Sequence, residues 1–136
     1  MNTPQGKILH KAVLSLGSNV YGSRSNNLMG ALNMIGRNIG RITDVSNFYE
    51  TQPYGPNSGN TPYLNAVAIV ETPFCKDKIE SQLKDIEDAT GRDRVSTNHD
   101  ITIDIDLVIL DGQILRPCEI ERDYFIRGWK EVKRYV

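Results

Sequence analysis

The chain has 136 residues, the size of one domain, and its contents of 39% hydrophobic and 24% charged residues are ordinary for a soluble globular protein. A formal net charge of −1 offers no basic surface to a nucleic-acid backbone. No stretch approaches the roughly 20 apolar residues of a membrane-spanning helix, and the N-terminal segment lacks a signal-peptide core. We therefore expect one domain over residues 1–136, a cytoplasmic monomer that binds small molecules and neither nucleic acid nor membrane.

Strands and helices alternate in the predicted first half of the chain. Residues 12–16 form an apolar run typical of a buried strand, and apolar residues from about 25 to 38 recur on one helical face. Gly40 is a plausible stop for this helix. Residues 41–49 are β-prone, and the proline- and glycine-rich residues 50–62 predict a long loop, of a kind that is often functional.

The second half of the chain continues this alternation. Residues 63–70 predict a strand with Asn65, Val67 and Ile69 on one face. A helix is expected over 76–89, and a β-branched strand over 102–110 follows a polar stretch. The order β-α-β-β-α-β predicts an α+β, ferredoxin-like fold, in which helices cover one face of a mixed, mostly antiparallel sheet.

Asp104 and Asp106 give the sharpest chemical signal. Alternate residues of a strand share a face, so both carboxylates point the same way, about 6–7 Å apart along the backbone. Ile109 is expected on the opposite face, and Val108 and Leu110 on the carboxylate face. Two such acids repel each other and lose hydration, which a divalent cation relieves, and magnesium binds one or two carboxylates together with phosphate oxygens. A magnesium–nucleotide site is one interpretation, and a solvated strand end with two free acids is the other.

Other candidate residues each have a plainer alternative. Arg92 and Arg94 could stabilise a phosphoryl group in transfer, or simply complement the dipole of the preceding helix. The Asn65 amide suits the edge of a flat heterocycle, but it could equally be satisfied by nearby backbone. Tyr63 and Trp129 could stack on a planar ring or pack in the core.

Five motifs occur in order along the chain. They are Leu16-Gly17-Ser18-Asn19, Phe48-Tyr49-Glu50-Thr51-Gln52-Pro53-Tyr54-Gly55, Tyr63-Leu64-Asn65-Ala66, Glu87 with Gly91-Arg92-x-Arg94, and Thr102-Ile103-Asp104-Ile105-Asp106-Leu107. In this order and near-correct spacing, they resemble the 6-hydroxymethyl-7,8-dihydropterin pyrophosphokinases from about residue 10 to 112. That family transfers the terminal diphosphate of ATP to the hydroxymethyl group of a reduced pterin, releases AMP, and serves folate synthesis.

The resemblance implies a role for each candidate residue. Asp104 and Asp106 would hold two magnesium ions that bridge the ATP triphosphate, and Arg92 would join them as a catalytic residue. The pterin site would consist of Thr51, Gln52, Tyr54, Tyr63, Asn65 and Trp129. Its two ring-stacking residues would be Tyr63 and Trp129, the latter placed by Arg127-Gly128-Trp129, which is similar to the family's Arg-x-Phe. The residues near ATP would be Glu87, Arg92, Arg94 and Arg127.

Departures from the family pattern keep other interpretations open. Ile101 stands where family members place an arginine that would touch the phosphates, and Asp100 adds an acid there. The loss of one such charge-stabilising group typically lowers the rate on the order of a hundredfold. The first interpretation is an active, magnesium-dependent diphosphokinase, and the second is a catalytically weak or inactive relative that binds pterin and nucleotide. A third, another nucleotide-handling enzyme, leaves Thr51 and Asn65 unexplained.

Overall fold

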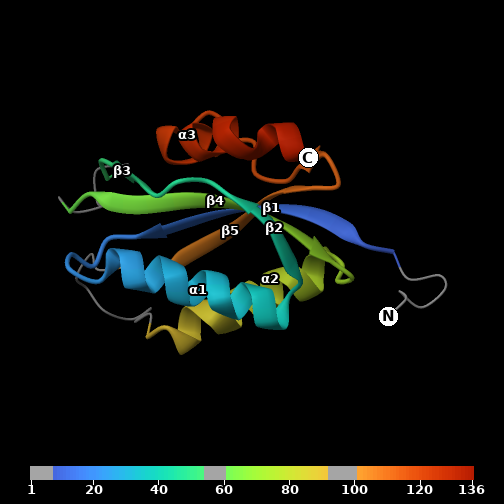
Figure 1. Ribbon diagram of the computed structural model, residues 1–136, viewed down its shortest axis with the longest axis horizontal. Helices are drawn as coiled ribbons and strands as arrows, with labels where there is room; N and C mark the ends of the chain where they lie inside the picture. The colour runs from blue at the N-terminus through green and yellow to red at the C-terminus, as the bar shows by residue number, and fades with distance from the viewer. Residues whose placement is uncertain (1–7, 54–60, 92–100) are drawn as a thin grey trace.

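Three helices lie on the two faces of one sheet in the computed structural model, which describes residues 8–53, 61–91 and 101–136 (Figure 1). Helices α1 (Arg24–Asn38) and α2 (Lys76–Ala89) lie together on one face, close to their predicted bounds. Helix α3 (Asp123–Val132) covers the other face, and the short 3-10 helix η1 (Lys133–Tyr135) follows it. The predicted site residues outside the described ranges are Tyr54, Arg92 and Arg94. None of the described helices is both long and apolar enough to cross a bilayer.

The sheet has the strand order β2-β4-β1-β5-β6, and β3 also pairs with β4. Its strands are β1 (His10–Ser18), β2 (Arg41–Val45), β3 (Tyr49–Thr51), β4 (Tyr63–Thr72), β5 (Asp104–Leu110) and β6 (Gln113–Ile114). The predicted α+β, ferredoxin-like fold is confirmed. We expected a mixed sheet, but every described strand pair is antiparallel.

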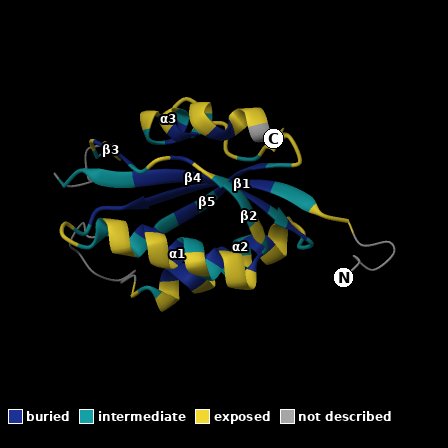
Figure 2. Ribbon diagram, viewed as in Figure 1, coloured by how far each residue is buried: buried dark blue, intermediate teal, exposed yellow. Residues whose placement is uncertain are grey.

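Two hydrophobic clusters hold the helices to the sheet. The larger one joins apolar side chains of β1, β4 and β5 to α1 and α2, and includes Leu14, Leu28 and Ile79. The smaller one lies under α3, where Val67 and Ile69 of β4 pack with Phe125. Figure 2 shows buried residues along the central strands and exposed residues on the outer sides of the helices. The predicted two faces of β4 are therefore confirmed.

A bulge in β5 changes which residues face α3. Ile109 pairs with Val13, whereas Leu107 pairs with Leu14, so β5 has one extra residue between them. Beyond this point, Ile109 packs in the cluster under α3, and Leu110 packs against the α1–α2 cluster. The expected facing of Ile109 and Leu110 was wrong, because a strand with an extra residue reverses its alternation.

Helix α3 is absent from the predicted elements, although its buried residues Phe125, Gly128 and Val132 recur at helical spacing. Residues 41–49, expected only to be β-prone, divide between β2 and β3, and β3 extends two residues into the predicted loop.

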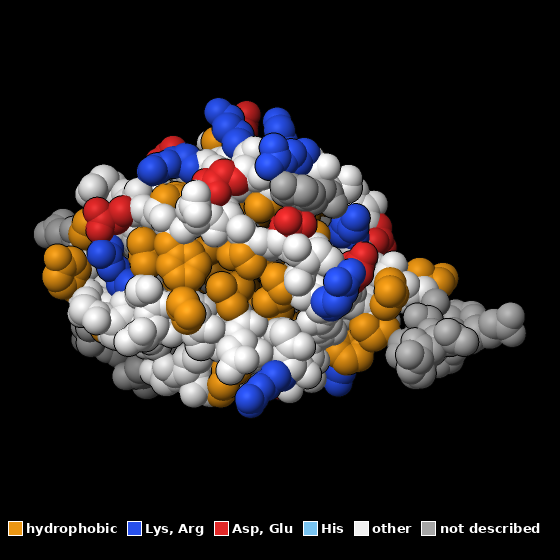
Figure 3. Space-filling model, in the orientation of Figure 1, with side chains coloured by type: hydrophobic (Ala, Val, Ile, Leu, Met, Phe, Trp, Pro, Cys, Tyr) orange, Lys and Arg blue, Asp and Glu red, His pale blue; other side chains and the backbone are white. Residues whose placement is uncertain are grey.

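In the face shown in Figure 3, hydrophobic side chains are visible between α3 and α1, while Lys and Arg side chains gather over α3. The helices therefore cover the faces of the sheet more fully than its outer edge.

The contact of α3 with the sheet yields a stability prediction. A Cβ atom at Gly128 would lie 2.6 Å from Val67 Cγ2, 2.8 Å from Tyr49 Oη and 2.9 Å from Ser46 Oγ. These atoms cannot move freely, because the Tyr49 hydroxyl donates to the Tyr124 carbonyl and Ser46 Oγ accepts from the Val67 N–H. Gly128→Ala should lower the free energy of unfolding in urea by about 2 kcal/mol.

Gly30→Ala is the matched control on a helix. No atom lies within 4 Å of a Cβ built at Gly30 of α1, so this change should raise the free energy of unfolding by about 0.5–1 kcal/mol. Equal stability of Gly128→Ala and the unmodified chain would contradict the close contact of α3 with the sheet.

Candidate active site

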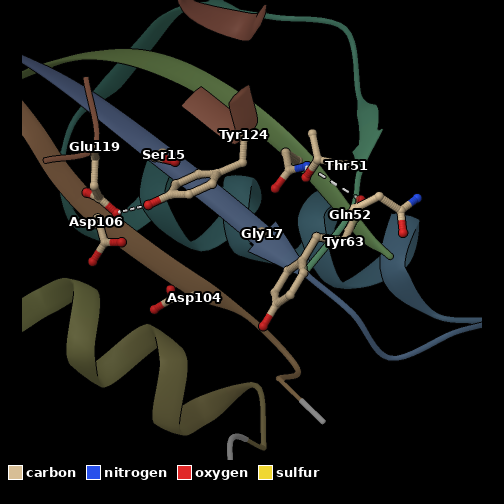
Figure 4. Close-up of a pocket in the computed structure, with 10 residues that line it drawn as sticks. Ser15, Gly17, Thr51, Gln52, Tyr63, Asp104, Asp106, Glu119 and Tyr124 are labelled. Atoms are coloured by element: carbon tan, nitrogen blue, oxygen red, sulfur yellow. Dashed lines mark hydrogen bonds between the residues drawn. The ribbon is translucent and has the colours of Figure 1, made fainter. Parts of the chain in front are cut away.

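A cavity of about 210 Å³, here called the inner cavity, opens on the α3 side of the sheet. Its lining residues are Ser15, Gly17, Thr51, Gln52, Tyr63, Asn65, Asp104, Asp106, Glu119 and Tyr124. Figure 4 shows how these side chains from β1, β3, β4, β5 and the α3 region converge. Six predicted site residues, from segments far apart in the sequence, therefore meet in one cavity.

Strand register explains why these residues meet. Gly17 of β1 pairs with Asn65 of β4 on one side and with Asp104 of β5 on the other. Two residues earlier in β1, and therefore on the same face, Ser15 pairs with Asp106. Residues directly opposite each other in an antiparallel pair share a face and lie about 5 Å apart. The amide of β4 and the carboxylates of β5 are thus separated by a strip of small residues.

The floor of the inner cavity depends on the missing side chain of Gly17. A Cβ atom there would lie 3.2 Å from Asn65 Oδ1 and 3.4 Å from Tyr63 Cδ2. The buried Asn65 side chain donates through Nδ2 to the Tyr49 carbonyl at 3.1 Å and to Thr51 Oγ1 at 2.8 Å. These acceptors fix the amide nitrogen, so the amide oxygen is turned toward the floor. The interpretation that nearby groups of the protein satisfy Asn65 thus holds for its amide nitrogen, and the heterocycle interpretation stays a prediction for its amide oxygen.

Asp106 of β5 lies in an electrostatically unfavourable environment. Burial and, after it, the neighbouring carboxylates of Asp104 and Glu119 together raise the pKa of Asp106 to about 8. Arg116 opposes these effects, since its Nη2 lies 3.5 Å from Asp106 Oδ1. A carboxyl group that retains its proton near neutral pH because it is buried beside other acids is well suited to a cation.

A metal ion would need further ligands at this site. Among the described residues, no group of three or more His, Cys, Asp or Glu side chains could hold a metal ion. Magnesium is commonly bound by one or two carboxylates plus substrate phosphates and water. Asp104 and Asp106 fit that pattern, provided that a phosphorylated ligand completes the coordination.

A second cavity of about 440 Å³, here called the outer cavity, lies on the other side of the acid pair. Its lining residues are Glu80, Leu83, Lys84, Glu87, Asp104, Ile105, Asp106, Leu107 and Arg116. Among the described residues, β6 pairs only with Ile109 and Leu110, so the first half of β5 has no strand partner on the side of the outer cavity and contacts α2. Asp104 and Asp106 line both cavities.

Glu87, expected near a nucleotide, lies in the wall of the outer cavity. It is buried, and its Oε2 accepts a hydrogen bond of 2.7 Å from the Ile105 N–H. This contact satisfies an N–H group at the open edge of β5 and ties α2 to the strand that carries the acids. Lys84 and Arg116 supply positive charge to the same wall.

Arg127 and Trp129 do not line either cavity. The Arg127 guanidinium donates to the Glu50 carbonyl at 2.8 Å and lies 5.1 Å from the centre of the Tyr49 ring. Trp129 stacks on Phe125, with ring centres 5.8 Å apart, beside the cluster under α3. The structure therefore does not bring these two predicted residues to the others.

Tyr124 is the aromatic residue that the sequence interpretation missed. Its ring and that of Tyr63 lie on either side of Gly17 in Figure 4. Burial and the hydrogen bond to Glu119 raise the pKa of the Tyr124 hydroxyl above its ordinary value, so it remains a neutral donor. Arg122-Asp123-Tyr124 has the same Arg-x-aromatic spacing as Arg127-Gly128-Trp129, five residues earlier. That earlier copy of the motif was the available signal.

A ferredoxin-like sheet with two cavities that meet at an acid pair is arranged for a reaction between two bound molecules. The model of one family, 7,8-dihydro-6-hydroxymethylpterin-pyrophosphokinase (HPPK), matches residues 13–134. The chain belongs to this family.

Two curated relatives agree with this assignment. A 2-amino-4-hydroxy-6-hydroxymethyldihydropteridine pyrophosphokinase of Porphyromonas gingivalis is 39% identical over 99 residues, which are 71% of this chain and 66% of the relative. The enzyme of the same name from Haemophilus influenzae is 31% identical over 106 residues, which are 77% of this chain and 65% of the relative. The aligned part of this chain thus spans just under two thirds of each relative.

Solved structures support the fold. A crystal structure of Plasmodium falciparum HPPK-DHPS matches with a TM-score of 0.61 at 17% identity, covering 79% of this chain and 30% of that one. The same protein with pteroate matches with a TM-score of 0.60 at 14% identity, covering 91% of this chain and 34% of that one. At such identities, the likeness concerns the fold alone.

The raised pKa of Asp106 predicts how stability depends on pH without metal. The folded protein holds a proton on Asp106 up to about pH 8, whereas the unfolded chain loses it near the ordinary Asp value of about 4. Stability should therefore fall as pH rises through this window, by up to about 1.4 kcal/mol per pH unit. Urea unfolding in EDTA from pH 5 to 8 measures this slope, and Asp106→Asn should flatten it.

Glu121→Gln serves as the control, because Glu121 is an exposed acid in the segment before α3. It should retain the slope of the unmodified chain. Parallel pH profiles for Asp106→Asn and the unmodified chain would contradict the electrostatic account of the site.

Proposed function

We propose that the chain transfers the terminal diphosphate of ATP to 6-hydroxymethyl-7,8-dihydropterin, giving the pterin diphosphate and AMP in folate biosynthesis. The observation that carries the proposal is the position of Asp104 and Asp106, which line both cavities. Family membership and the names of the curated relatives support the same reaction.

The inner cavity is the proposed pterin site. The ring would lie between Tyr63 and Tyr124, since flat heterocycles stack favourably on aromatic side chains. Asn65 Oδ1 would accept hydrogen bonds from the N–H groups of the pterin, and Thr51, whose oxygen accepts from Asn65, could donate its own proton to a ring acceptor. Gln52 would contact the same edge of the ring. A purely apolar pocket would lack this complementarity.

The outer cavity is the proposed nucleotide site. Lys84 and Arg116 would balance the charge of the triphosphate, as would Arg92 and Arg94 by their resemblance to the family motif. Two magnesium ions at Asp104 and Asp106 would neutralise the phosphates and align an in-line displacement.

The transfer requires the two ligands to meet beside the acid pair. The hydroxymethyl oxygen would bond to the β-phosphorus of ATP, and the bond from that phosphorus to the bridging oxygen of the α-phosphate would break, so that AMP leaves. Gly17 and Ser15 leave β1 without bulk between Asn65 and the acid pair, so that a ligand of the inner cavity could reach the acids. Such close approach is a large source of rate acceleration in reactions between bound molecules.

Binding with little turnover is the second candidate function. Its basis is Ile101, which stands where the family places a phosphate-binding arginine. The backbone of Ile101 is held against Asn19 by two hydrogen bonds, Asn19 N–H to the Ile101 carbonyl at 3.0 Å and Ile101 N–H to Asn19 Oδ1 at 2.5 Å. An apolar side chain is therefore anchored at the start of the strand that bears the acids.

An AMP-release assay distinguishes these functions. The unmodified chain should form AMP only when ATP, the reduced pterin and magnesium are all present. Asp104→Ala or Asp106→Ala should lower turnover by about a hundredfold or more, because the phosphates lose their metal contact. Glu121→Ala should retain full activity. Pterin binding without AMP formation would favour the weak relative, and absence of pterin binding would contradict both functions.

Asn65→Ala should separate the two sites. Loss of the amide oxygen should weaken pterin binding by about tenfold, the size of one good hydrogen bond, because partner N–H groups on the ring would be left unpaired. The affinity for a non-hydrolysable ATP analogue with magnesium should change by less than about twofold, because Asn65 does not line the outer cavity. Isothermal titration of each ligand measures both effects. Equal weakening of both ligands would argue against the assignment of the inner cavity.

A further inference from the structure

Glu119 contacts one wall of each cavity with a single carboxylate. It lies between β6 and α3, and its side chain is 12% exposed. Its Oε1 accepts a hydrogen bond of 2.9 Å from the Tyr124 hydroxyl, and its Oε2 accepts one of 2.7 Å from Arg116 Nε. Figure 4 shows Glu119 beside Asp106 at the end of the Tyr124 ring. Both oxygens of this carboxylate are thus engaged, each with a different cavity wall.

Hydrogen bonds hold Tyr124 both at its backbone and at its hydroxyl group. Its backbone carbonyl accepts a hydrogen bond of 2.6 Å from the Tyr49 hydroxyl of β3, which fixes the start of α3 over the sheet. Its hydroxyl is fixed by Glu119. Without the second contact, only packing against the cluster under α3 would hold the ring, and this wall of the inner cavity would be less well fixed.

Arg116 is held by the same carboxylate from the other side. Its side chain is 46% exposed, and a long side chain at such a position samples many rotamers unless partners fix it. Glu119 binds its Nε, and Asp106 lies 3.5 Å from its Nη2, so the guanidinium is directed along the acid pair into the outer cavity. The planar fork of arginine suits this arrangement, because its several N–H groups lie in one fixed plane.

We propose that Glu119 is a positioning residue that couples the pterin and nucleotide cavities, by fixing Tyr124 and Arg116 through one carboxylate. This inference rests on the proposed function of the two cavities. A ligand that presses on the Tyr124 ring orders Glu119, and with it the guanidinium that faces the other ligand. By linkage, each ligand then improves the binding of the other by the same factor.

Two double-mutant cycles test the proposal by isothermal titration of the full chain. The probes are 6-hydroxymethylpterin for the inner cavity and α,β-methylene-ATP with magnesium for the outer cavity. Glu119→Ala should weaken each probe by about tenfold, the effect of losing a hydrogen bond to a charged group. Tyr124→Phe should weaken only the pterin probe, and Arg116→Ala should weaken mainly the nucleotide probe.

The double mutants decide whether Glu119 acts through Tyr124 and Arg116. Adding Glu119→Ala to Tyr124→Phe should cause no further loss of pterin affinity, and adding it to Arg116→Ala should cause no further loss of nucleotide affinity. Glu119→Gln can keep both contacts, because its carbonyl oxygen can accept from Arg116 Nε while its amide N–H donates to the Tyr124 hydroxyl oxygen, so it should weaken both probes less than Glu119→Ala does. Additive losses in both cycles, or an unchanged Glu119→Ala variant, would overturn the proposal.

A matched control and a ligand-free readout separate this proposal from the proposed function. Glu121→Ala, two residues away and exposed, should alter neither affinity. In the ligand-free protein, proton NMR should detect a slowly exchanging Tyr124 hydroxyl that disappears in Glu119→Ala. A chain that binds neither probe but shows this proton would count against the proposed function alone. A chain without this protected proton would count against the role of Glu119.

Discussion

The pairing of β1 with β4 on one side and β5 on the other is the constraint on which the site depends. It sets Asn65, Gly17 and Asp104 in one row across the sheet, with Ser15 and Asp106 in the next row. A shift of one residue in either pairing would turn the amide or the carboxylates to the opposite face of the sheet, which α1 and α2 cover. Because β1 is buried on both faces, such a shift would also expose apolar side chains. The stability of the core and the geometry of the site are therefore enforced by the same register.

Helix α3 and the segment before it complete the walls of the two cavities. This part of the chain supplies an aromatic wall through Tyr124, and it brings Arg116 and Glu119 to the acids of β5. The result is an imbalance of charge, with three carboxylates close together and one guanidinium among them. Burial and this imbalance raise the pKa of Asp106, and the imbalance makes the site receptive to cations. The same imbalance would be relieved when a metal–phosphate ligand binds.

Local patterning predicted the three long strands β1, β4 and β5 and the helices α1 and α2 well, because periodicity reports directly on which faces are buried, but it missed β6 and placed part of β3 in a loop. It failed where the outcome depends on partners distant in sequence. The facing of Ile109 depends on a bulge that only pairing with β1 reveals. Thr51, Asn65 and the aspartates could be predicted together from the ordered motifs. Trp129 was predicted and Tyr124 was missed: two copies of Arg-x-aromatic lie five residues apart, and only the packing of α3 on the sheet decides which ring reaches the cavity.

A crystal structure of the chain with magnesium, α,β-methylene-ATP and 6-hydroxymethylpterin would test the central claim most directly. The decisive quantity is the distance from the hydroxymethyl oxygen to the β-phosphorus, together with the metal ligands. We expect about 3–3.5 Å, the range for groups poised to react, with metal bound to Asp104 and Asp106. A pterin outside the inner cavity, or metal and triphosphate bound away from these two carboxylates, would contradict the account.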